Sequence, residues 1–544
     1  MKKISRRDFV KLAGSSVAFG AIGTAFPSLL SREQIIEGAD KYDHIVVLML
    51  ENRSFDNMLG YLYQQNELPP GEYFNGVAGK NFSNPVTIPD TTYSVDSVHV
   101  YPGTVMTDPS PDPGEEYPHI NTQLFNTILP DSNKFRHVAN MQAPFNEPFP
   151  LPNPAPMNGF VNDYIYYYKL YMGRYPTVDE FKIIMACFPP TAIPVMSTLA
   201  KSFAVCDNWH CSVPSQTFCN RTFFNSSTSW GYVNNSPAEK WALNFAPTIY
   251  NRMQDANQPW KIYFDVLDVI PSTLLLHFLK LKDYIGNFCT MEGFYNDVKN
   301  GNLPKYSFIE PRMHWFHNDE HPPDEGPHQN TNFPTPSNVL AGEQLIHNIY
   351  MAIRNSDSKT GSNYQNTLFM ITYDEHGGCF DHVPPKPAAP PYIIPPFPHE
   401  YENGFRFERS GIRVPTILIS SYIAEKTIVH TPFEHTSVIK TLCEKYGMPH
   451  LTDRDLLNPN TLNSVFNLST PRSRDNWPVT HPRQLPVDAD KEYYSNESLT
   501  GFQRDLMLLA KALGKVGGSN PVTIADGIEI LNSAKKNLGL NFCL

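Results

Sequence analysis

The stretch DHIVVLMLENRSFDNMLGYL (residues 43–62) contains the transition that decides the fold. Residues 44–50 form an almost unbroken apolar run, which is the pattern of a strand buried on both faces of a sheet. The run stops abruptly at the polar segment ENRS (residues 51–54). Doubly buried strands are typical of parallel sheets in α/β proteins, so this transition predicts an α/β fold with polar groups at a strand end.

A second stretch repeats this pattern far along the chain. NTLFMITYDEHGGCFDHVPP (residues 366–385) begins as a buried strand and ends with Asp374 and Glu375. The carboxyl ends of parallel strands share one edge of a sheet, where ligands bind. We therefore expect Asp374 and Glu375 to lie near Glu51 and Asn52.

Other apolar runs complete the expected architecture. Further strands are predicted at residues 306–309 and at 414–420 (VPTILIS), the second ending at the same edge. Apolar residues at helical spacing predict helices at residues 341–354, 435–446 and 499–513. No clean linker divides the middle of the chain, so we expect one catalytic domain (residues 40–460) with long loop insertions. Residues 461–544 are expected to form a C-terminal extension whose helices pack on that domain.

The composition narrows the classes of function. The chain has 544 residues, of which 41% are hydrophobic and 18% are charged, as in a folded soluble protein. Its 54 acidic and 43 basic side chains give a formal net charge of −11. Lys and Arg form no run beyond the N-terminal segment, and nucleic-acid binding needs a basic face. Nucleic acid is therefore excluded as an expected partner.

The N-terminal segment MKKISRRDFVKLAGSSVAFGAIGTAF has the pattern of an export signal. The pair Arg6 and Arg7 precedes a mildly apolar run that is too short for a comfortable membrane span. Residues 1–30 are thus interpreted as a twin-arginine signal peptide, which makes the twin-arginine export machinery a partner and the location periplasmic or secreted. Proteins exported in this way cross the membrane already folded, which suits a chain that collects a metal in the cytoplasm.

The cysteines favour no structural zinc site, because no CxxC pair occurs among them. Cys206, Cys211 and Cys219 lie close together in the sequence. An oxidising periplasm would permit a disulfide bond among them, and buried thiols are an equally acceptable interpretation.

The polar residues at the two strand ends suggest a metal site. Glu51, Asn52, Asp374 and Glu375 present carboxylate and amide oxygens, which suit a hard or borderline divalent cation. The alternative is that these acids cap the helices that follow the strands. Their convergence at one edge favours one or more divalent metal ions, whose identity the sequence leaves open.

A hydroxyl-rich segment, residues 208–231, contains Thr217 followed by Asn220 and Arg221. A hydroxyl held against a divalent metal loses its proton more easily and becomes a nucleophile. An arginine nearby can hold phosphate oxygens. By itself, this segment is also compatible with a surface turn. Of the histidines, His435 at a helix start and His321 in NDEHP are the most informative candidates for acid–base chemistry.

Several motifs in one order together resemble a known family. The family is the phosphoesterase family, which includes bacterial phospholipases C, plant non-specific phospholipases C and acid phosphatases. The stretches similar to its motifs are ENRSFDNMLGYL, VPSQTFCNR, SFIEPR with NDEHP, TYDEHGGCFDHVPP and EHTSVIKTL. The resemblance covers roughly residues 43–446. It implies an alkaline-phosphatase-like α/β fold, with a central mixed, largely parallel sheet flanked by helices.

The resemblance also implies roles for individual residues. Glu51, Asn52, Asp374 and Glu375 match the metal ligands of the family, and Thr217 matches the nucleophile, which also contacts the metal. Asn220 and Arg221 are expected to bind the phosphate of the substrate.

The sequence departs from the family pattern around these residues. Ser215, Gln216 and Cys219 replace the usual residues around Thr217. Glu115 stands where relatives often carry the histidine of DPGH, so the histidine expected there is His119 or is missing. In NDEHPPDEGP, His321 is retained, whereas Asp324 replaces a second histidine.

These observations predict an exported metal-dependent phosphoesterase. The expected activity is that of a phospholipase C, which would hydrolyse phosphatidylcholine-type lipids through a phosphothreonine at Thr217, with His321 or His435 protonating the leaving group. Phospholipid or phosphate-ester substrates and transient contact with a membrane surface or lipid aggregates follow from this activity. The alternatives are an acid phosphatase acting on monoesters and a non-catalytic periplasmic protein that binds phospholipid.

Overall fold

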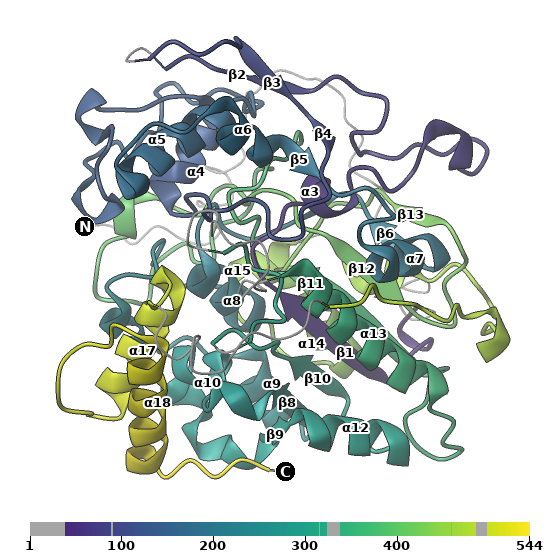
Figure 1. The fold of residues 1–544 in the computed structure, drawn as a ribbon. Helices are drawn as coiled ribbons and strands as arrows, with labels where there is room; N and C mark the ends of the chain where they lie inside the picture. Colours follow the sequence, from purple (N-terminus) through teal and green to yellow (C-terminus); the bar gives the residue numbers. More distant parts are fainter. Residues whose placement is uncertain are drawn as a thin grey trace, which may run out of the picture.

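The computed structural model describes residues 38–88, 91–314, 316–323, 338–458, 460–485 and 498–543. The expected signal peptide, residues 1–30, lies outside the described residues. At the centre is an eight-stranded sheet of order β13-β6-β12-β11-β1-β10-β8-β9 (Figure 1). The sheet lies between helices, and a smaller α-helical region with two short strand pairs lies beside it at the top of the view.

The strand β1 (His44–Leu50) lies inside the sheet. It pairs in parallel with β11 (Thr367–Tyr373) on one side and with β10 (Tyr306–Ile309) on the other. Beyond β10 follow β8 (Trp260–Phe264) and β9 (Phe288–Thr290), both parallel to it. Every residue of β1 and β11 is buried, as the apolar runs predict. The predicted α/β class with a mixed, largely parallel central sheet is confirmed.

One strand runs opposite to the prediction. β12 (Thr416–Ile419) pairs antiparallel with both β11 and β6 (Ala204–Cys206), whereas β13 (Thr427–Val429) is parallel to β6. The carboxyl end of β12 therefore points away from the edge where β1 and β11 end, and the expectation for residues 414–420 is wrong in direction. An apolar run predicts a buried strand, but it carries no information about strand direction.

Helices cover both faces of the sheet. One connected layer contacts β6, β8, β9, β11 and β12 and consists of α7 (Pro194–Ser202), α12 (Met291–Asn300) and α13 (Val339–Asn355). A second connected layer consists of α8 (Thr217–Ser226), α9 (Ile249–Asp255) and α14 (Thr436–Tyr446). These bounds confirm the helices predicted at residues 341–354 and 435–446.

The insertion between β1 and β6 builds the region at the top of Figure 1. It has its own apolar core, which includes Ile120, Tyr164 and Phe181. Its elements are β2 (Ser83–Pro85), β3 (Ser97–His99), β4 (Tyr101–Pro102), β5 (Ala186–Cys187), α4 (Tyr117–Phe125), α5 (Phe160–Met172) and α6 (Val178–Phe181). The remaining short elements are α3 (Phe55–Leu59), α10 (Ser272–Leu276), α11 (Phe278–Leu281), α15 (Asp453–Leu457), β7 (Trp209–His210) and β14 (Phe433–Glu434).

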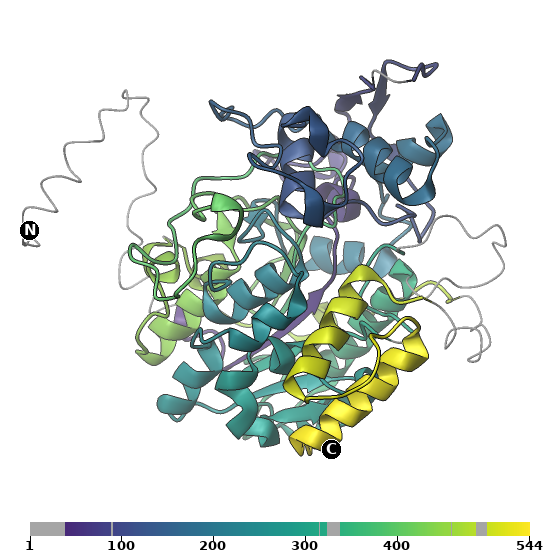
Figure 2. The same cartoon turned by 90° about the vertical axis from the view of Figure 1, so that its left-hand side faces the viewer.

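The C-terminal extension ends in two helices that pack on each other, drawn in yellow in Figure 2. α17 (Gly501–Leu513) and α18 (Ile524–Leu538) lie against the domain through the 3-10 helix η5 (Ala238–Leu243) and α10. A disulfide bond between Cys289 at β9 and Cys543 ties the end of the extension to the sheet.

The cysteines that the sequence places close together are not bridged. Cys206, Cys211 and Cys219 are all buried free thiols, so the second of the two interpretations holds for them. Within the residues that the structure describes, no helix is both long enough and apolar enough to cross a membrane.

A buried ion network fixes the segment that follows β1. The guanidinium of Arg413 is fully buried and lies 3.0 Å from carboxylate oxygens of both Asp56 and Asp381. It also donates to the backbone carbonyl of Asp207 at 2.7 Å. Asp56 belongs to α3 and Asp381 to the loop after β11, so Arg413 joins the two segments that extend from the sheet edge.

The substitution Arg413→Met should destabilise the protein by about 3–5 kcal/mol, because it removes the guanidinium that pairs with both buried carboxylates. Urea unfolding followed by circular dichroism measures this loss. Lys182→Met is the matched control, since its pair with Asp179 is exposed and contributes at most about 1 kcal/mol. A loss for Arg413→Met no larger than that of the control would show that the network does not stabilise the fold.

Candidate active site

The candidate site lies where β1 and β11 end side by side. Leu50 and Tyr373 are partners in the parallel register, so Glu51 and Asp374 leave the sheet at the same level. The backbone N–H of Asn52 donates to Asp374 Oδ1 at 3.1 Å. The structure thus brings together the two acidic segments that the sequence places far apart.

The backbone at this edge is unusually tight. Asn52 has a φ of 58°, in the left-handed region, which asparagine tolerates better than most residues. Gly377 also has a positive φ, and a Cβ atom there would lie 2.0 Å from the carbonyl oxygen of Asn52. Only glycine fits at this position. The glycine pair of DEHGG therefore lets the loop after β11 pass directly over the loop after β1.

Thr217 comes to this edge from a different part of the chain. It is the first residue of α8 and is fully buried. Its Oγ1 lies 3.4 Å from Asn52 Oδ1. A helix N-terminus carries a partial positive charge, which stabilises negative charge on a hydroxyl placed there. The start of α8 would therefore stabilise negative charge on the Thr217 oxygen.

The electrostatics of the site favour a cation. Burial raises the pKa of Glu51 well above its usual range; the charge of Asp374 raises it further, and Arg221 opposes the shift. Burial and the charge of Asp374 likewise raise the pKa of Glu375. Glu51 Oε2 and Glu375 Oε1 are buried and have no hydrogen-bond partner among the described residues. Crowded carboxylates with unused oxygens fit a divalent metal ion, and Glu51, Asn52, Thr217, Asp374 and Glu375 would hold it.

Arg221 is the positive charge within this set. It donates through Nε to Glu51 at 2.9 Å and to Asp374 at 3.2 Å. Its Nη1 has no hydrogen-bond partner among the described residues and can still donate to a ligand. Arg221 therefore orients the carboxylates, and its predicted contact with phosphate rests on Nη1 alone.

Asn220 has other contacts than those predicted. Its side-chain oxygen accepts from the backbone N–H of Val213 at 3.0 Å, and its amide donates to the carbonyl of Ser215 at 2.7 Å. These bonds fix the turn that delivers Thr217. The prediction of phosphate binding assumes that the side chain of Asn220 faces the substrate. In the structure this side chain instead forms hydrogen bonds with the loop backbone.

Of the histidine candidates, only His321 lines the site's cavity. His435 is fully buried: its Nε2 contacts the carbonyl oxygen of Asp374 at 2.6 Å, and Trp209 donates to its Nδ1 at 3.4 Å. Burial lowers the pKa of His435 to about 4. A neutral imidazole held between two protein groups supports Asp374 and is poorly placed to protonate a leaving group.

His119 also faces the protein. Its Nδ1 lies 2.9 Å from Asp163 Oδ1, inside the insertion. Burial alone would lower the pKa of His119, but the charge and hydrogen bond of Asp163 outweigh it and raise the pKa to about 9. The hydrogen-bonded His119–Asp163 pair joins α4 to α5, and the raised pKa of His119 favours its charged form.

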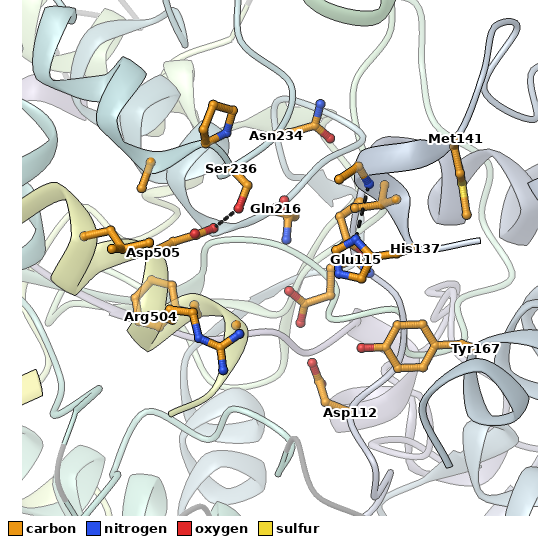
Figure 3. A pocket seen from close by; sticks show the side chains of 18 of the residues that line it. Asp112, Glu115, His137, Met141, Tyr167, Gln216, Asn234, Ser236, Arg504 and Asp505 are labelled. Carbon is orange, nitrogen blue, oxygen red and sulfur yellow. Dashed lines mark hydrogen bonds between the residues drawn. The ribbon is translucent and has the colours of Figure 1, made fainter. Parts of the chain in front are cut away.

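A cavity of about 900 Å³ opens beside the strand edge (Figure 3). Glu115 lines it and also accepts a hydrogen bond from the amide of Asn52. The ligand atoms of Asp112, Glu115 and His321 lie within 4.8 Å of one another, so this edge offers oxygen and nitrogen ligands beyond the first set. Apolar side chains form much of the rest of the lining, among them Val138, Met141, Phe145, Tyr167, Phe502 and Leu508.

Sequence reasoning missed part of this site. Asp112 lies in the DPG motif, which the sequence analysis considers only because Glu115 departs from the family pattern. The presence of two acids just before a helix could have identified both Asp112 and Glu115 as site residues. Arg504 of α17 also lines the cavity. No sequence signal connects an arginine in an amphipathic helix to a site built by strands far away.

Comparisons with known proteins agree with the geometry. The sequence profile described as "Phosphoesterase family" matches residues 42–449. Non-specific phospholipase C3 of Arabidopsis thaliana is 31% identical over 515 residues, which cover 90% of this chain and 86% of that protein. Phospholipase C B of Mycobacterium tuberculosis is 26% identical and covers 88% of this chain and 89% of that protein.

A solved structure is also similar. The protein comes from Vibrio parahaemolyticus and is described as a member of the alkaline phosphatase superfamily. It is 10% identical with a TM-score of 0.29, over 64% of this chain and 82% of that chain.

Removal of metal should destabilise the protein, and Asp374 should be necessary for the effect. A cation present at a hundred times its Kd stabilises the folded state by about 2.7 kcal/mol. We expect a chelator to lower the Tm of the wild type and a divalent cation to restore it, with no such response in Asp374→Asn. Asp357→Asn, at an exposed carboxylate, is the control. An equal cation response in Asp374→Asn and wild type would place the metal elsewhere.

The contribution of His119 to stability should depend on pH. Its pKa is raised from 6.5 to about 9 in the folded protein. The stabilisation is therefore fully present below about pH 6.5 and is lost as the pH rises through about 9. Denaturant unfolding of His119→Gln and wild type should differ most near about pH 6 and least above about pH 9.5. The same difference at both pH values would mean that the imidazole is not charged in the folded state.

Proposed function

The chain belongs to the phosphoesterase family and is a phosphoric ester hydrolase; on this premise we propose that it is a metal-dependent phospholipase C that cleaves phosphatidylcholine-type phospholipids. The family resemblance drawn from the sequence motifs is thereby confirmed. The observation that carries the proposal is the place of Thr217: a buried hydroxyl at a helix N-terminus, 3.4 Å from an amide oxygen of the carboxylate-rich edge.

The proposed reaction proceeds through two displacements at phosphorus. When bound, a divalent cation held by Glu51, Asn52, Asp374 and Glu375 would supply Lewis acidity that lowers the pKa of the Thr217 hydroxyl. Thr217 Oγ1 gives its proton to water and attacks phosphorus to form a phosphothreonine diester, while the bond to the glycerol oxygen breaks and His321 protonates that oxygen to release diacylglycerol. A second water molecule, which gives a proton to His321, then attacks the same phosphorus. The bond from phosphorus to Thr217 Oγ1 breaks, the phosphorylated head group leaves, and Oγ1 takes a proton from water to recover its hydroxyl.

The cavity supports a lipid substrate over a small phosphomonoester. Its volume of about 900 Å³ is large for a phosphate ester alone, and aromatic and aliphatic side chains line it next to the strand edge. Such a lining stabilises part of a diacylglycerol by removing its apolar surface from water. The relatives are named phospholipases C, which supports the same substrate class.

Export is part of the proposal. The twin-arginine pattern of residues 1–30 would direct the folded chain to the periplasm or beyond. The Cys289–Cys543 disulfide bond supports this location, because disulfide bonds persist in oxidising compartments. In that location the enzyme would contact a membrane surface or lipid aggregates transiently to reach its substrate.

Thr217→Ala should abolish turnover, with a rate reduction of at least about 1,000-fold, because the attacking oxygen is removed. The measurement is release of diacylglycerol from phosphatidylcholine, beside hydrolysis of p-nitrophenyl phosphate, each with and without chelator. Thr222→Ala on the same helix is the matched control, since it removes a buried hydroxyl that has no hydrogen-bond partner among the described residues.

The outcomes separate the candidate functions. Diacylglycerol release with little monoester cleavage supports the phospholipase C, whereas the reverse identifies an acid phosphatase. No hydrolysis of either substrate by the metal-loaded wild type would favour a protein that binds phospholipid without cleaving it. Normal activity in Thr217→Ala would contradict the proposed mechanism.

A further inference from the structure

The C-terminal extension forms one wall of the cavity beside the active site. Three residues of α17 line the cavity, namely Phe502, Arg504 and Leu508. Leu499, which precedes the helix, also lines it. Figure 3 shows the guanidinium of Arg504 pointing toward Asp112 and Glu115, which line the same cavity. The family profile ends at residue 449, so this wall comes from a part of the chain that the profile does not include.

Hydrogen bonds connect α17 to the catalytic edge. Gln503 Nε2 lies 2.8 Å from His317 Nε2, and His317 Nδ1 lies 2.8 Å from Asp319 Oδ2. Asp319 in turn accepts from the backbone N–H of His321 at 3.1 Å and, through its carbonyl, from that of Glu51 at 2.8 Å. The extension is therefore held in a defined position relative to the metal-ligand and general-acid candidates.

Negative charge dominates the cavity. The acidic residues among those that line it are Asp112, Glu115, Glu116, Glu239, Glu402 and Asp505. Within the described lining, Arg504 is the one lysine or arginine. A phosphate ester carries negative charge, so its approach is opposed by these carboxylates unless positive groups offset them.

Arg504 is placed to provide such a group. Its side chain is exposed to solvent, and Figure 3 shows its guanidinium reaching into the cavity with no hydrogen bond to the other side chains drawn. A guanidinium presents paired N–H donors that match the oxygens of a phosphate group. Among the described residues the guanidinium gives up no hydrogen bond when it donates to a ligand.

We propose that Arg504 binds the anionic oxygens of the phosphoryl group in the substrate and in the phosphorylated head group that is released. The C-terminal extension is then part of the substrate site and not only a cover for the domain. This proposal rests on the proposed phosphoesterase function for its substrate, but the phosphoryl contact can be measured independently of turnover.

The kinetic test compares Arg504→Gln and Arg504→Lys with wild type, using p-nitrophenyl phosphorylcholine as a soluble diester. Loss of a charge-assisted, bidentate contact should raise KM by about tenfold or more with little change in kcat. The KM of Arg504→Lys should lie between those of the wild type and Arg504→Gln, because lysine keeps the charge but lacks the paired donors. Lys536→Gln is the matched control: it removes one positive charge from an exposed position on α18.

Binding of inorganic phosphate by calorimetry provides the second measurement. We expect the affinity of the metal-loaded protein for phosphate to fall about tenfold or more in Arg504→Gln and to stay unchanged in Lys536→Gln. If the wild type hydrolyses no ester, a selective loss of phosphate binding in Arg504→Gln still supports the contact. Unchanged KM and unchanged phosphate affinity in Arg504→Gln would overturn it, whatever the activity of the wild type.

Discussion

Carboxylates that are buried together at one edge of the sheet repel one another, and the rest of the structure has to offset this repulsion. Glu51, Asp374 and Glu375 are fully buried, and Arg221 is the positive charge that pairs with Glu51 and Asp374. Burial of unpaired negative charge is costly, so the folded state either protonates these groups or binds a cation. The packing of two strands that each end in acids therefore favours a bound cation at this edge.

Other features of the fold hold this edge in place. The left-handed backbone at Asn52 and the close approach of Gly377 bring the two loops together. Arg413 joins the same two loops through buried ion pairs with Asp56 and Asp381. Asn220 fixes the turn before α8, and His435 contacts the carbonyl of Asp374. These contacts hold Thr217 in a defined position at the sheet edge, which suits a nucleophile that must be aligned with phosphorus.

The sequence allowed much of the fold and part of the site to be predicted. Doubly buried strands have a strong local pattern, so β1, β10 and β11 and the meeting of Glu51 with Asp374 were predictable. The direction of β12 was not, because direction is set by the connections of the chain. The contacts of Asn220 and His435 were also not predictable, since residue type does not show whether a side chain faces substrate or backbone. Arg504 reaches the cavity only through tertiary packing of α17.

In the proposed mechanism three distant segments form one reaction centre, and Thr217 becomes covalently attached to phosphorus. The most direct test is mass spectrometry of enzyme quenched during turnover of p-nitrophenyl phosphorylcholine. We expect a phosphorylated head group on the peptide that contains Thr217, formed with a divalent cation and absent with chelator. Turnover with no adduct on that peptide, or with an adduct on another residue, would contradict it.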